Sequence, residues 1–366
     1  MIVKLGSLIS EYSVRNKADE DIPVYSVTNE QGFCTGYFSK EVASQDRTTY
    51  KIVPRGCFAY NPSRINVGSV DVQECEDRVI VSPLYVVFSV DEKLNRRYLL
   101  HYLKSDITLT YIKAYASGSV RDNLKFSILK DFPINLPSAE EQGQIVATLD
   151  GIEHLIALRK EEIASLDELV KSRFIEMFVT DKNVSHWPQV AISDVSTDMR
   201  TGPFGSALHH DEFVDSGVFV LGIDNAVENR FSYNRMRYIT EEKYSQLKRY
   251  TVYPGDVIIT IMGTVGRSAV IPQDMPKAIN TKHLACITPD SAVIDPCFLA
   301  SAFQMHPTIR LQLQNQCKGA IMDGLNLTII KGLRFQLPPI DQQKQFSGFV
   351  EQTDKSKLCG EMEVAA

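Results

Sequence analysis

Residues 136–145, LPSAEEQGQI, have the pattern of a strand that ends and a helix that begins. Residues 337–346, LPPIDQQKQF, repeat this pattern much later in the chain. In the first stretch Pro137 ends an extended segment, because proline cannot continue a strand ladder. Ser138 is an N-cap residue, and Glu141 stands three residues further on, which is the spacing of a capping box. The two stretches therefore predict that the chain starts an equivalent helix twice.

An internal repeat surrounds the two helix starts. Residues 118–142, GSVRDNLKFSILKDFPINLPSAEEQ, align without a gap with residues 319–343, GAIMDGLNLTIIKGLRFQLPPIDQQ, at an offset of 201. Gln142 is among the identical positions and recurs as Gln343. A period of about 200 residues is too long for a solenoid repeat, whose units span about 20–45 residues. The repeat therefore indicates duplication of a whole domain together with the helix that follows it.

Both copies show the same order of predicted elements. Runs rich in β-branched and aromatic residues predict strands at 22–27 and 77–90 in the first copy, and at 217–223 and 255–262 in the second. In the first copy a helical segment follows at 96–115, and then a glycine loop and an apolar strand that ends in Leu-Pro. We expect an α+β fold with two tandem globular domains, each followed by a long helix.

The first long helix carries a heptad seam. Apolar residues recur at alternating spacings of four and three, with one interruption: Ile145, Leu149, Ile152, Ile156, Ile163, Leu166 and Val170. Further apolar residues, Leu155, Leu169, Phe174 and Phe178, widen the stripe and suggest a second partner surface. A helix over 139–178 would extend roughly 60 Å at about 1.5 Å per residue, so we interpret it as a spacer. The alternative is a plain linker, which would not need a second helix start.

These patterns give four predicted segments. The first domain spans 1–138, the first spacer helix 139–180, the second domain 181–338 and the second spacer helix 339–366. We expect the second helix to be short or truncated, about half as long as the first, because its tail loses the heptad pattern and contains Gly360. A homodimer, in which a second molecule completes the helical bundle, is therefore a hypothesis.

The composition is that of an ordinary globular protein. A formal net charge of −6 means that any DNA-binding surface must be a local patch. Seven cysteines without a CxxC pair fit a reducing cytosol. The sequence shows no signal-peptide pattern and no apolar run of membrane-spanning length. We expect a cytoplasmic protein without membrane contact.

Motifs for catalysis and metal binding are missing from the sequence. It contains no P-loop GxxxxGK[ST], no HExxH and no Cys/His pattern with metal-ligand spacing. Residues 61–64, NPSR, begin like the Asn-Pro-Pro-aromatic motif of amino-methyltransferases, but Ser63 and Arg64 break it. We therefore expect a chain that catalyses no reaction and holds no metal.

Several weaker motifs occur in a fixed order. The first copy contains VKLGSLI (3–9), YNPSRINVGSV (60–70) and GSVRDNL (118–124), and the second contains WPQVAISDV (187–195), RTGPFGSAL (200–208), PGDVIIT (254–260), GTVGRSAV (263–270) and NTKHLACI (280–287). Together with the duplicated Leu-Pro helix start, they resemble the specificity subunit of type I restriction–modification enzymes. The resemblance covers essentially the whole chain.

This resemblance implies a division of labour between subunits. Each domain would be a target-recognition domain that reads one half of a bipartite site in double-stranded DNA. The two helical regions would pack as an antiparallel coiled coil, set the distance between the half-sites and dock two methyltransferase subunits. Restriction subunits would join that core. The resemblance places S-adenosylmethionine, ATP and Mg on the partner subunits, and no cofactor in this chain.

Candidate DNA contacts are loop residues that can bind phosphates or base edges. The polar and basic candidates are Arg64, Asn66, Arg121 and Lys125 in the first copy, and Arg200, Ser206, Arg267, Lys282 and His283 in the second. Four glycines would let the backbone approach a phosphate: Gly202, Gly205, Gly263 and Gly266. The alternative for each residue is a solvated surface charge or a structural turn.

Two other classes of function stay open. A DNA methyltransferase or restriction enzyme would carry its own catalysis, and methyl transfer by the isolated chain would reveal it. A tandem adaptor without DNA binding would use its helices to recruit helical partners. Salt-dependent binding to a bipartite duplex, in the presence of the methyltransferase subunit, would separate this adaptor from a DNA-specificity subunit.

Overall fold

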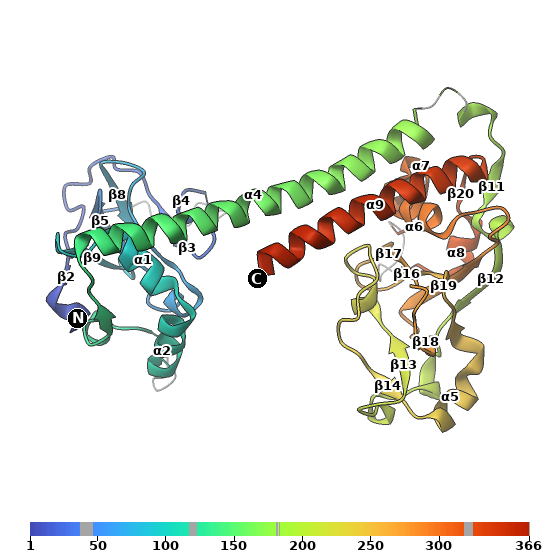
Figure 1. Ribbon diagram of the computed structural model, residues 1–366, viewed down its shortest axis with the longest axis horizontal. Helices are drawn as coiled ribbons and strands as arrows, with labels where there is room; N and C mark the ends of the chain where they lie inside the picture. The colour runs from blue at the N-terminus through green and yellow to red at the C-terminus, as the bar shows by residue number, and fades with distance from the viewer. Residues whose placement is uncertain (37–46, 117–122, 181, 183, 318–324, 366) are drawn as a thin grey trace. The chain divides into compact units, whose positions relative to one another are not determined.

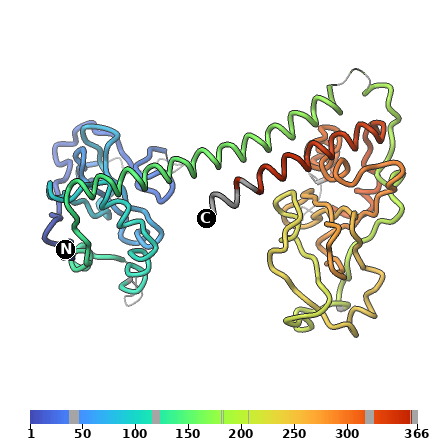
Figure 2. Tube along the Cα trace, viewed as in Figure 1, coloured from blue at the N-terminus to red at the C-terminus, as the bar shows by residue number. Residues whose placement is uncertain are grey.

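The computed structural model describes residues 1–36, 47–116, 123–180, 182, 184–317 and 325–365. The chain divides into two compact units, Met1–Ala157 and Leu158–Ala366. Helix α4 (Ala139–Phe178) begins in the first unit and ends in the second. Figures 1 and 2 trace the chain through both units. Strands and helices are mixed in each unit, which confirms the predicted α+β class with two tandem domains.

The first unit is built on a four-stranded antiparallel sheet in the order β2–β9–β6–β7, with three smaller strand pairs, β1–β10, β3–β4 and β5–β8, among the described residues. The strand bounds are β1 Ile2–Lys4, β2 Ile9–Glu11, β3 Ser26–Thr28, β4 Gly32–Cys34, β5 Lys51–Pro54, β6 Phe58–Tyr60, β7 Val70–Val72, β8 Arg78–Val81, β9 Val86–Val90 and β10 Pro133–Asn135. The rings of Phe58 and Phe88 stack in its core at 5.1 Å between centroids.

The helices of the first unit are α1 (Arg96–Lys104), α2 (Asp106–Ala116), α3 (Phe126–Leu129) and the start of α4. The sequence predicted one helical segment over 96–115, and this prediction was wrong at Ser105. There the backbone is extended, with φ −66° and ψ 148°, and separates α1 from α2. The Ser105 hydroxyl donates to the Tyr102 carbonyl oxygen at 2.8 Å, a side-chain bond that competes with helical pairing.

The second unit contains two four-stranded sheets, β12–β19–β16–β17 and β14–β13–β18–β15, and the pair β11–β20. The strand bounds are β11 Gln189–Ala191, β12 Ser196–Thr201, β13 Val218–Leu221, β14 Tyr238–Ile239, β15 Thr251–Val252, β16 Val257–Thr260, β17 Ser268–Val270, β18 Ala278–Asn280, β19 Leu284–Pro289 and β20 Arg334–Gln336. The helices are α5 Glu241–Leu247, α6 Pro296–Met305, α7 Pro307–Cys317, α8 Leu327–Gly332 and α9 Ile340–Ala365. All strand pairs are antiparallel except β13–β18, among the residues described.

The duplication seen in the sequence extends to the strand order. The sheet β2–β9–β6–β7 of the first unit corresponds to β12–β19–β16–β17 of the second, and β1–β10 corresponds to β11–β20. The helix pair α1–α2 corresponds to α6–α7, and each copy ends in a long helix. Both long helices begin at the same point of the repeat, at Ala139 and Ile340, which are 201 residues apart.

Within the second unit, the end of α4 and α9 pack as an antiparallel pair (Figure 1). The rings of Phe174 and Phe346 lie 5.4 Å apart, and the Lys357 ammonium pairs with Asp167 at 2.6 Å. Since numbers fall along α4 as they rise along α9, the two helices run in opposite directions. This arrangement is the predicted antiparallel coiled coil.

Helix α9, which the sequence predicted as a short second spacer helix over 339–366, spans Ile340–Ala365. The helix continues through Gly360 to Ala365 and has 26 residues against the 40 of α4. A Cβ atom placed on Gly360 would lie 3.6 Å from the Ile163 side chain, so this position faces α4. A distance of 3.6 Å is an ordinary van der Waals contact, so this position has room for a Cβ atom.

None of the helices in the described part of the chain combines the length and the apolar character that a membrane crossing requires.

Candidate nucleic-acid interface

In the first unit, the loop between β6 and β7 lies beside the segment that precedes α3. The Leu124 amide donates to the Pro62 carbonyl oxygen at 3.0 Å. The Tyr60 hydroxyl, at the end of β6, donates to the Leu124 carbonyl oxygen at 3.2 Å. These bonds hold residues 61–69 next to residues 124–125, and we call this region the loop end of the first unit.

Three of the four predicted contacts of the first copy belong to this loop end. Arg64 and Lys125 are exposed, and Asn66 is half-buried within the 3-10 turn Ile65–Val67. The fourth, Arg121, lies outside the described residues. The structure thus brings together two basic residues that are 61 positions apart in the sequence.

The second unit repeats this arrangement. The Leu325 amide donates to the Ile261 carbonyl oxygen at 2.9 Å, and Leu325 is the counterpart of Leu124 at the offset of 201. The Ile261 amide in turn donates to the carbonyl oxygen of His283 at 2.9 Å. Gly202 lies against the backbone of Thr281, so three loops, 202–205, 261–267 and 281–283, meet and form the loop end of the second unit.

The glycines at this loop end have different roles. Gly263 and Gly266 have φ angles of +75° and +83°, a left-handed backbone that glycine adopts readily. Gly205, with φ +62°, is exposed to open space. Gly202 is buried, and a Cβ atom there would lie 2.2 Å from the Asn280 carbonyl oxygen. Gly202 is therefore required by packing inside the unit, and it does not present its backbone to a ligand.

Arg200 is not an exposed contact in this structure, contrary to the interpretation from sequence. Its side chain is 11% exposed and forms an ion pair with the buried Asp256. The guanidinium also donates to Asp198 at 2.7 Å and to the Thr251 carbonyl oxygen at 2.9 Å. Arg200 extends from β12 into these acceptors, so it stabilises the sheet from within.

Two exposed cations, Arg267 and Lys282, remain at the loop end of the second unit. His283 is half-buried beside them, and its pKa is lowered by burial and by the nearby charges of Lys282 and Arg237. A neutral imidazole can both donate and accept a hydrogen bond at neutral pH. The side chain of Ser206, the last predicted contact, lies outside the described residues.

Sequence reasoning missed several residues at this loop end. Phe204 and Met262 expose 55% and 40% of their surface there. The position of Phe204 between two glycines in GPFG was an available signal for an exposed aromatic residue. Arg237 pairs with Asp224 at 2.8 Å, and no pattern in the sequence links these two positions.

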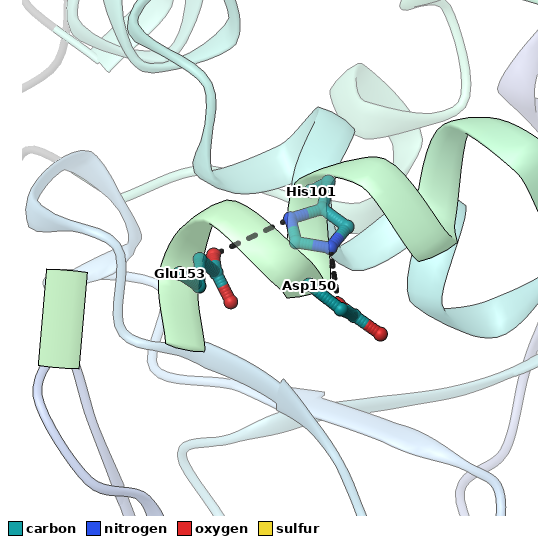
Figure 3. A group of neighbouring side chains, drawn as sticks. All are labelled: His101, Asp150 and Glu153. Atoms are coloured by element: carbon teal, nitrogen blue, oxygen red, sulfur yellow. Dashed lines mark hydrogen bonds and ion pairs between the residues drawn. The ribbon is translucent and has the colours of Figure 1, made fainter. Parts of the chain in front are cut away.

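A second cluster connects α1 to α4 inside the first unit (Figure 3). The Nε2 atom of His101 lies 2.7 Å from the Asp150 carboxylate, and its Nδ1 atom lies 3.4 Å from Glu153. Arg97 donates to Asp150 at 2.7 Å. The Arg97 guanidinium, followed by His101, lowers the pKa of the Asp150 carboxyl. The cluster joins α1 to α4, and the Arg97 guanidinium balances the negative charge of Asp150 and Glu153.

The predicted heptad residues have graded burial. Val170 is buried in the core of the second unit together with Phe174, Phe178 and Phe346. Ile145, Ile156, Ile163 and Leu166 are partly buried, whereas Leu149 and Ile152 are 36% and 48% exposed. Phe174 and Phe178 were expected to face a second partner, and that partner is the core of the second unit itself.

These features define a class of protein: a duplicated α+β chain that presents a set of loops from each copy and in which each copy is followed by a long helix. The chain belongs to the family described as the type I restriction modification DNA specificity domain, whose model matches residues 6–168 and 204–359.

Individual relatives agree with this assignment. The chain is 24% identical over 287 residues to the type I restriction enzyme EcoBI specificity subunit of Escherichia coli, covering 72% of this chain and 59% of that protein. It spans between 59% and 64% of the length of the curated relatives it matches.

Solved structures show the same fold. One, from a study of complex assembly and conformational transition of the type I R-M system, matches with a TM-score of 0.61 at 16% identity, covering 100% of this chain and 93% of that one. The S subunit of a type I restriction–modification system from M. genitalium matches with a TM-score of 0.57 at 14% identity, covering 100% and 92%.

Proposed function

We propose that this chain is a non-catalytic DNA-specificity subunit of a type I restriction–modification complex. Each unit reads one half of a bipartite site in double-stranded DNA, and the helices set the spacing between the half-sites. The observation that carries the proposal is the repeated loop end. In each copy the amide of the equivalent leucine, Leu124 or Leu325, donates to a carbonyl oxygen of the corresponding loop, at 3.0 Å and 2.9 Å. Family membership supplies the chemical context.

The exposed residues of the two loop ends suit this function. Arg64 and Lys125 in one unit, and Arg267 and Lys282 in the other, can neutralise phosphates. Phosphate contacts position a protein on the duplex but carry no sequence information. Neighbouring groups that can pair with base edges or contact a thymine methyl, such as His283 and Phe204, would add specificity.

The proposed partners follow from the same assignment. Two methyltransferase subunits dock on the helical regions, and restriction subunits join the assembly. S-adenosylmethionine, ATP and Mg bind to those partner subunits, and this chain binds none of these cofactors. The proposed compartment is the cytoplasm.

A homodimer through the spacer helices is a further part of the proposal. Leu149, Ile152 and Leu155 on α4 are 36%, 48% and 62% exposed, although the first two belong to the heptad seam. Exposed apolar stripes of this kind mark interaction surfaces. Light scattering across micromolar concentrations should show a dimer that Ile152→Lys abolishes. A strict monomer in the unmodified chain contradicts this part and leaves the DNA-binding part intact.

The test of DNA recognition uses the chain assembled with its methyltransferase partner. Sequencing of methylated sites in cells carrying both identifies the bipartite site, and duplexes containing it are then bound at several salt concentrations. We expect affinity to fall steeply with salt, and Lys282→Ala to reduce the salt slope by about 1. Lys331→Ala, an exposed lysine on α8 outside the three loops, is the matched control and should leave the slope unchanged. Binding without salt dependence, or no binding to any methylated site, would overturn the proposal.

A further inference from the structure

Gln142, near the start of α4, is 1% exposed and uses its whole side-chain amide. Its oxygen accepts the Asn95 amide at 2.7 Å. Its nitrogen donates to the carbonyl oxygens of Lys93 at 3.0 Å and Pro137 at 3.1 Å. One side chain thus ties α4 to the segment that begins α1.

Gln343 makes the same three bonds at the start of α9. It is 0% exposed, and its oxygen accepts the Asp295 amide at 2.8 Å. Its nitrogen donates to the carbonyl oxygens of Val293 at 3.2 Å and Pro338 at 2.8 Å. We call each glutamine with its three bonded groups an amide clamp.

Each clamp acts on a helix start that is already capped. Asn95 and Asp295 are the N-cap residues of α1 and α6, and their side chains accept the amides of the first turn. In a capping box, a residue at the third helical position bonds the N-cap amide from the same helix. Here a glutamine from another helix takes that part, so the starts of two helices are joined.

Only a glutamine can complete these bonds. A glutamate would place a carboxylate, which cannot donate, against two carbonyl oxygens in a buried site. A methionine of similar shape would leave one buried amide and two carbonyl groups without this partner, which costs free energy.

The clamps are maintained across a change in chain length. The two N-cap residues are 200 positions apart, whereas the two glutamines are 201 apart. One copy therefore has an additional residue between the N-cap and the glutamine, and yet all three bonds recur. The repeated feature is the geometry of the joint between helix and unit, and the segment between its ends varies in length.

We infer that Gln142 and Gln343 are positioning residues that fix the direction in which each long helix leaves its unit, and that this direction determines which half-site spacings the protein accepts. The inference rests on the proposed DNA-specificity function. It assigns spacing selectivity to two buried amides that contact no DNA.

The test measures spacing selectivity in the complex with the methyltransferase partner. Duplexes carry the same two half-sites, with the spacer at its native length or changed by one base pair. The readout is the ratio of affinity for the native spacer to affinity for the altered ones. We expect Gln142→Met and Gln343→Met each to lower this ratio about fivefold, the effect of about one net hydrogen bond. Single-base changes inside each half-site should be discriminated as before.

Gln144→Met and Gln345→Met are the matched controls, because these glutamines are exposed on the same helices. Both should retain the unmodified ratio. If a methionine variant does not fold, Gln→Asn at the same position retains the amide on a shorter side chain, and it should lower the ratio in the same direction by less.

A parallel loss of affinity for all spacers, with the ratio unchanged, would show that the glutamines stabilise the fold without setting the spacing, and would overturn the inference. Failure of the unmodified complex to bind any bipartite duplex would instead overturn the proposed function. Hydrogen exchange tests the clamps without any DNA: the Asn95 and Asp295 amides should lose protection in the methionine variants, and retained protection would contradict the inference.

Discussion

The two joints between helix and unit share an amide clamp and differ in the side chains that pack further along the joined helices. In the first joint, between α1 and α4, a polar cluster lies further along the helices from the clamp, where the Asp150 carboxylate accepts a hydrogen bond from Arg97 and contacts His101. In the second joint, α6, α9 and the end of α4 meet around a cluster of aromatic rings. The centroids of Phe178 and Phe298 are 4.7 Å apart.

The difference follows from the number of helices that each joint contains. The first joint holds one long helix against α1, and the side chains between them are partly exposed, so charges can stay hydrated. In the second joint three helices pack together, and water is excluded from its centre. Buried apolar area stabilises the second joint, whereas the first depends on ion pairs that salt and pH can weaken.

The largest expected effect comes from removing an aromatic ring of the second joint. Phe174 is fully buried and contacts Phe178, Phe298 and Phe346. Phe174→Ala should lower the free energy of unfolding of the second unit by about 3–5 kcal/mol, measured by denaturant unfolding. Phe204→Ala, at an exposed ring, should change it by less than about 0.5 kcal/mol. Similar losses in the two variants would contradict the aromatic basis of the second joint.

Acid should weaken the second joint through a histidine. His306 packs against the Phe174 ring, and burial lowers its pKa to about 4. A buried neutral histidine stabilises the fold fully above its ordinary pKa of 6.5, and this contribution is lost as the pH falls toward 4. The loss should reach about 3 kcal/mol.

Calorimetric unfolding between pH 7 and 4 would measure this loss. His306→Asn is the comparison, because it retains an acceptor for the Thr308 amide but does not titrate in this range. Its stability should fall less steeply with acid. Equal slopes for both proteins would exclude His306 as the titrating group.

Loss of the cap on α4 should have a smaller effect. The Ser138 hydroxyl accepts the Glu141 amide at 3.3 Å, and Glu141 accepts the Ser138 amide at 2.8 Å, which confirms the predicted capping box. Ser138→Ala should cost about 1 kcal/mol, detected as faster hydrogen exchange in the first turn of α4. Ser165→Ala, in the interior of the same helix, should not be destabilising because alanine has the highest helix propensity. A larger effect at Ser165 would contradict the capping assignment.

The smallest effect is expected in the ionic cluster of the first joint. Asp150→Asn should cost less than about 1 kcal/mol, because the pair with Arg97 is partly exposed. Since the pKa of Asp150 is lowered in the folded state, its contribution is present above the ordinary carboxyl pKa and is lost as the pH falls through the lowered value. Glu351, at the matching position of α9, pairs only with Lys355 among the described groups, so Glu351→Gln is the control. Unfolding at low and high salt should show a salt-sensitive loss in the first variant and almost none in the second.

Local signals in the sequence predicted the duplicated framework. Pro137, Ser138 and Glu141 lie within five residues of each other, so the start of α4 could be inferred without tertiary contacts. The antiparallel pairing of the two helices was predicted only from the family resemblance, because the repeat shows that a second helix starts but not how the two helices pack. The break at Ser105 escaped prediction because no proline or glycine marks it, and only a serine hydroxyl interrupts the helix.

The site was harder to predict because its contacts join distant positions. Arg200 looked like a loop cation beside GPFG, but its partner Asp256 is 56 residues away and buried. The cluster of His101 and Asp150 depends on a separation of 49 residues and on the packing of two helices. Gln142 and Gln343 were visible as a repeated residue, whereas their function required the three bonds that each one makes.

The amide clamps have a consequence for how such a chain can change over generations. Every group bound by Gln142 and Gln343 belongs to the main chain, so these bonds do not depend on which side chains stand at the bound positions. The two copies already differ at these positions: Lys93 in the first copy corresponds to Val293 in the second, and the N-cap residue is Asn95 in the first and Asp295 in the second. A lineage can therefore replace the surfaces that a domain presents while inheriting its attachment unchanged.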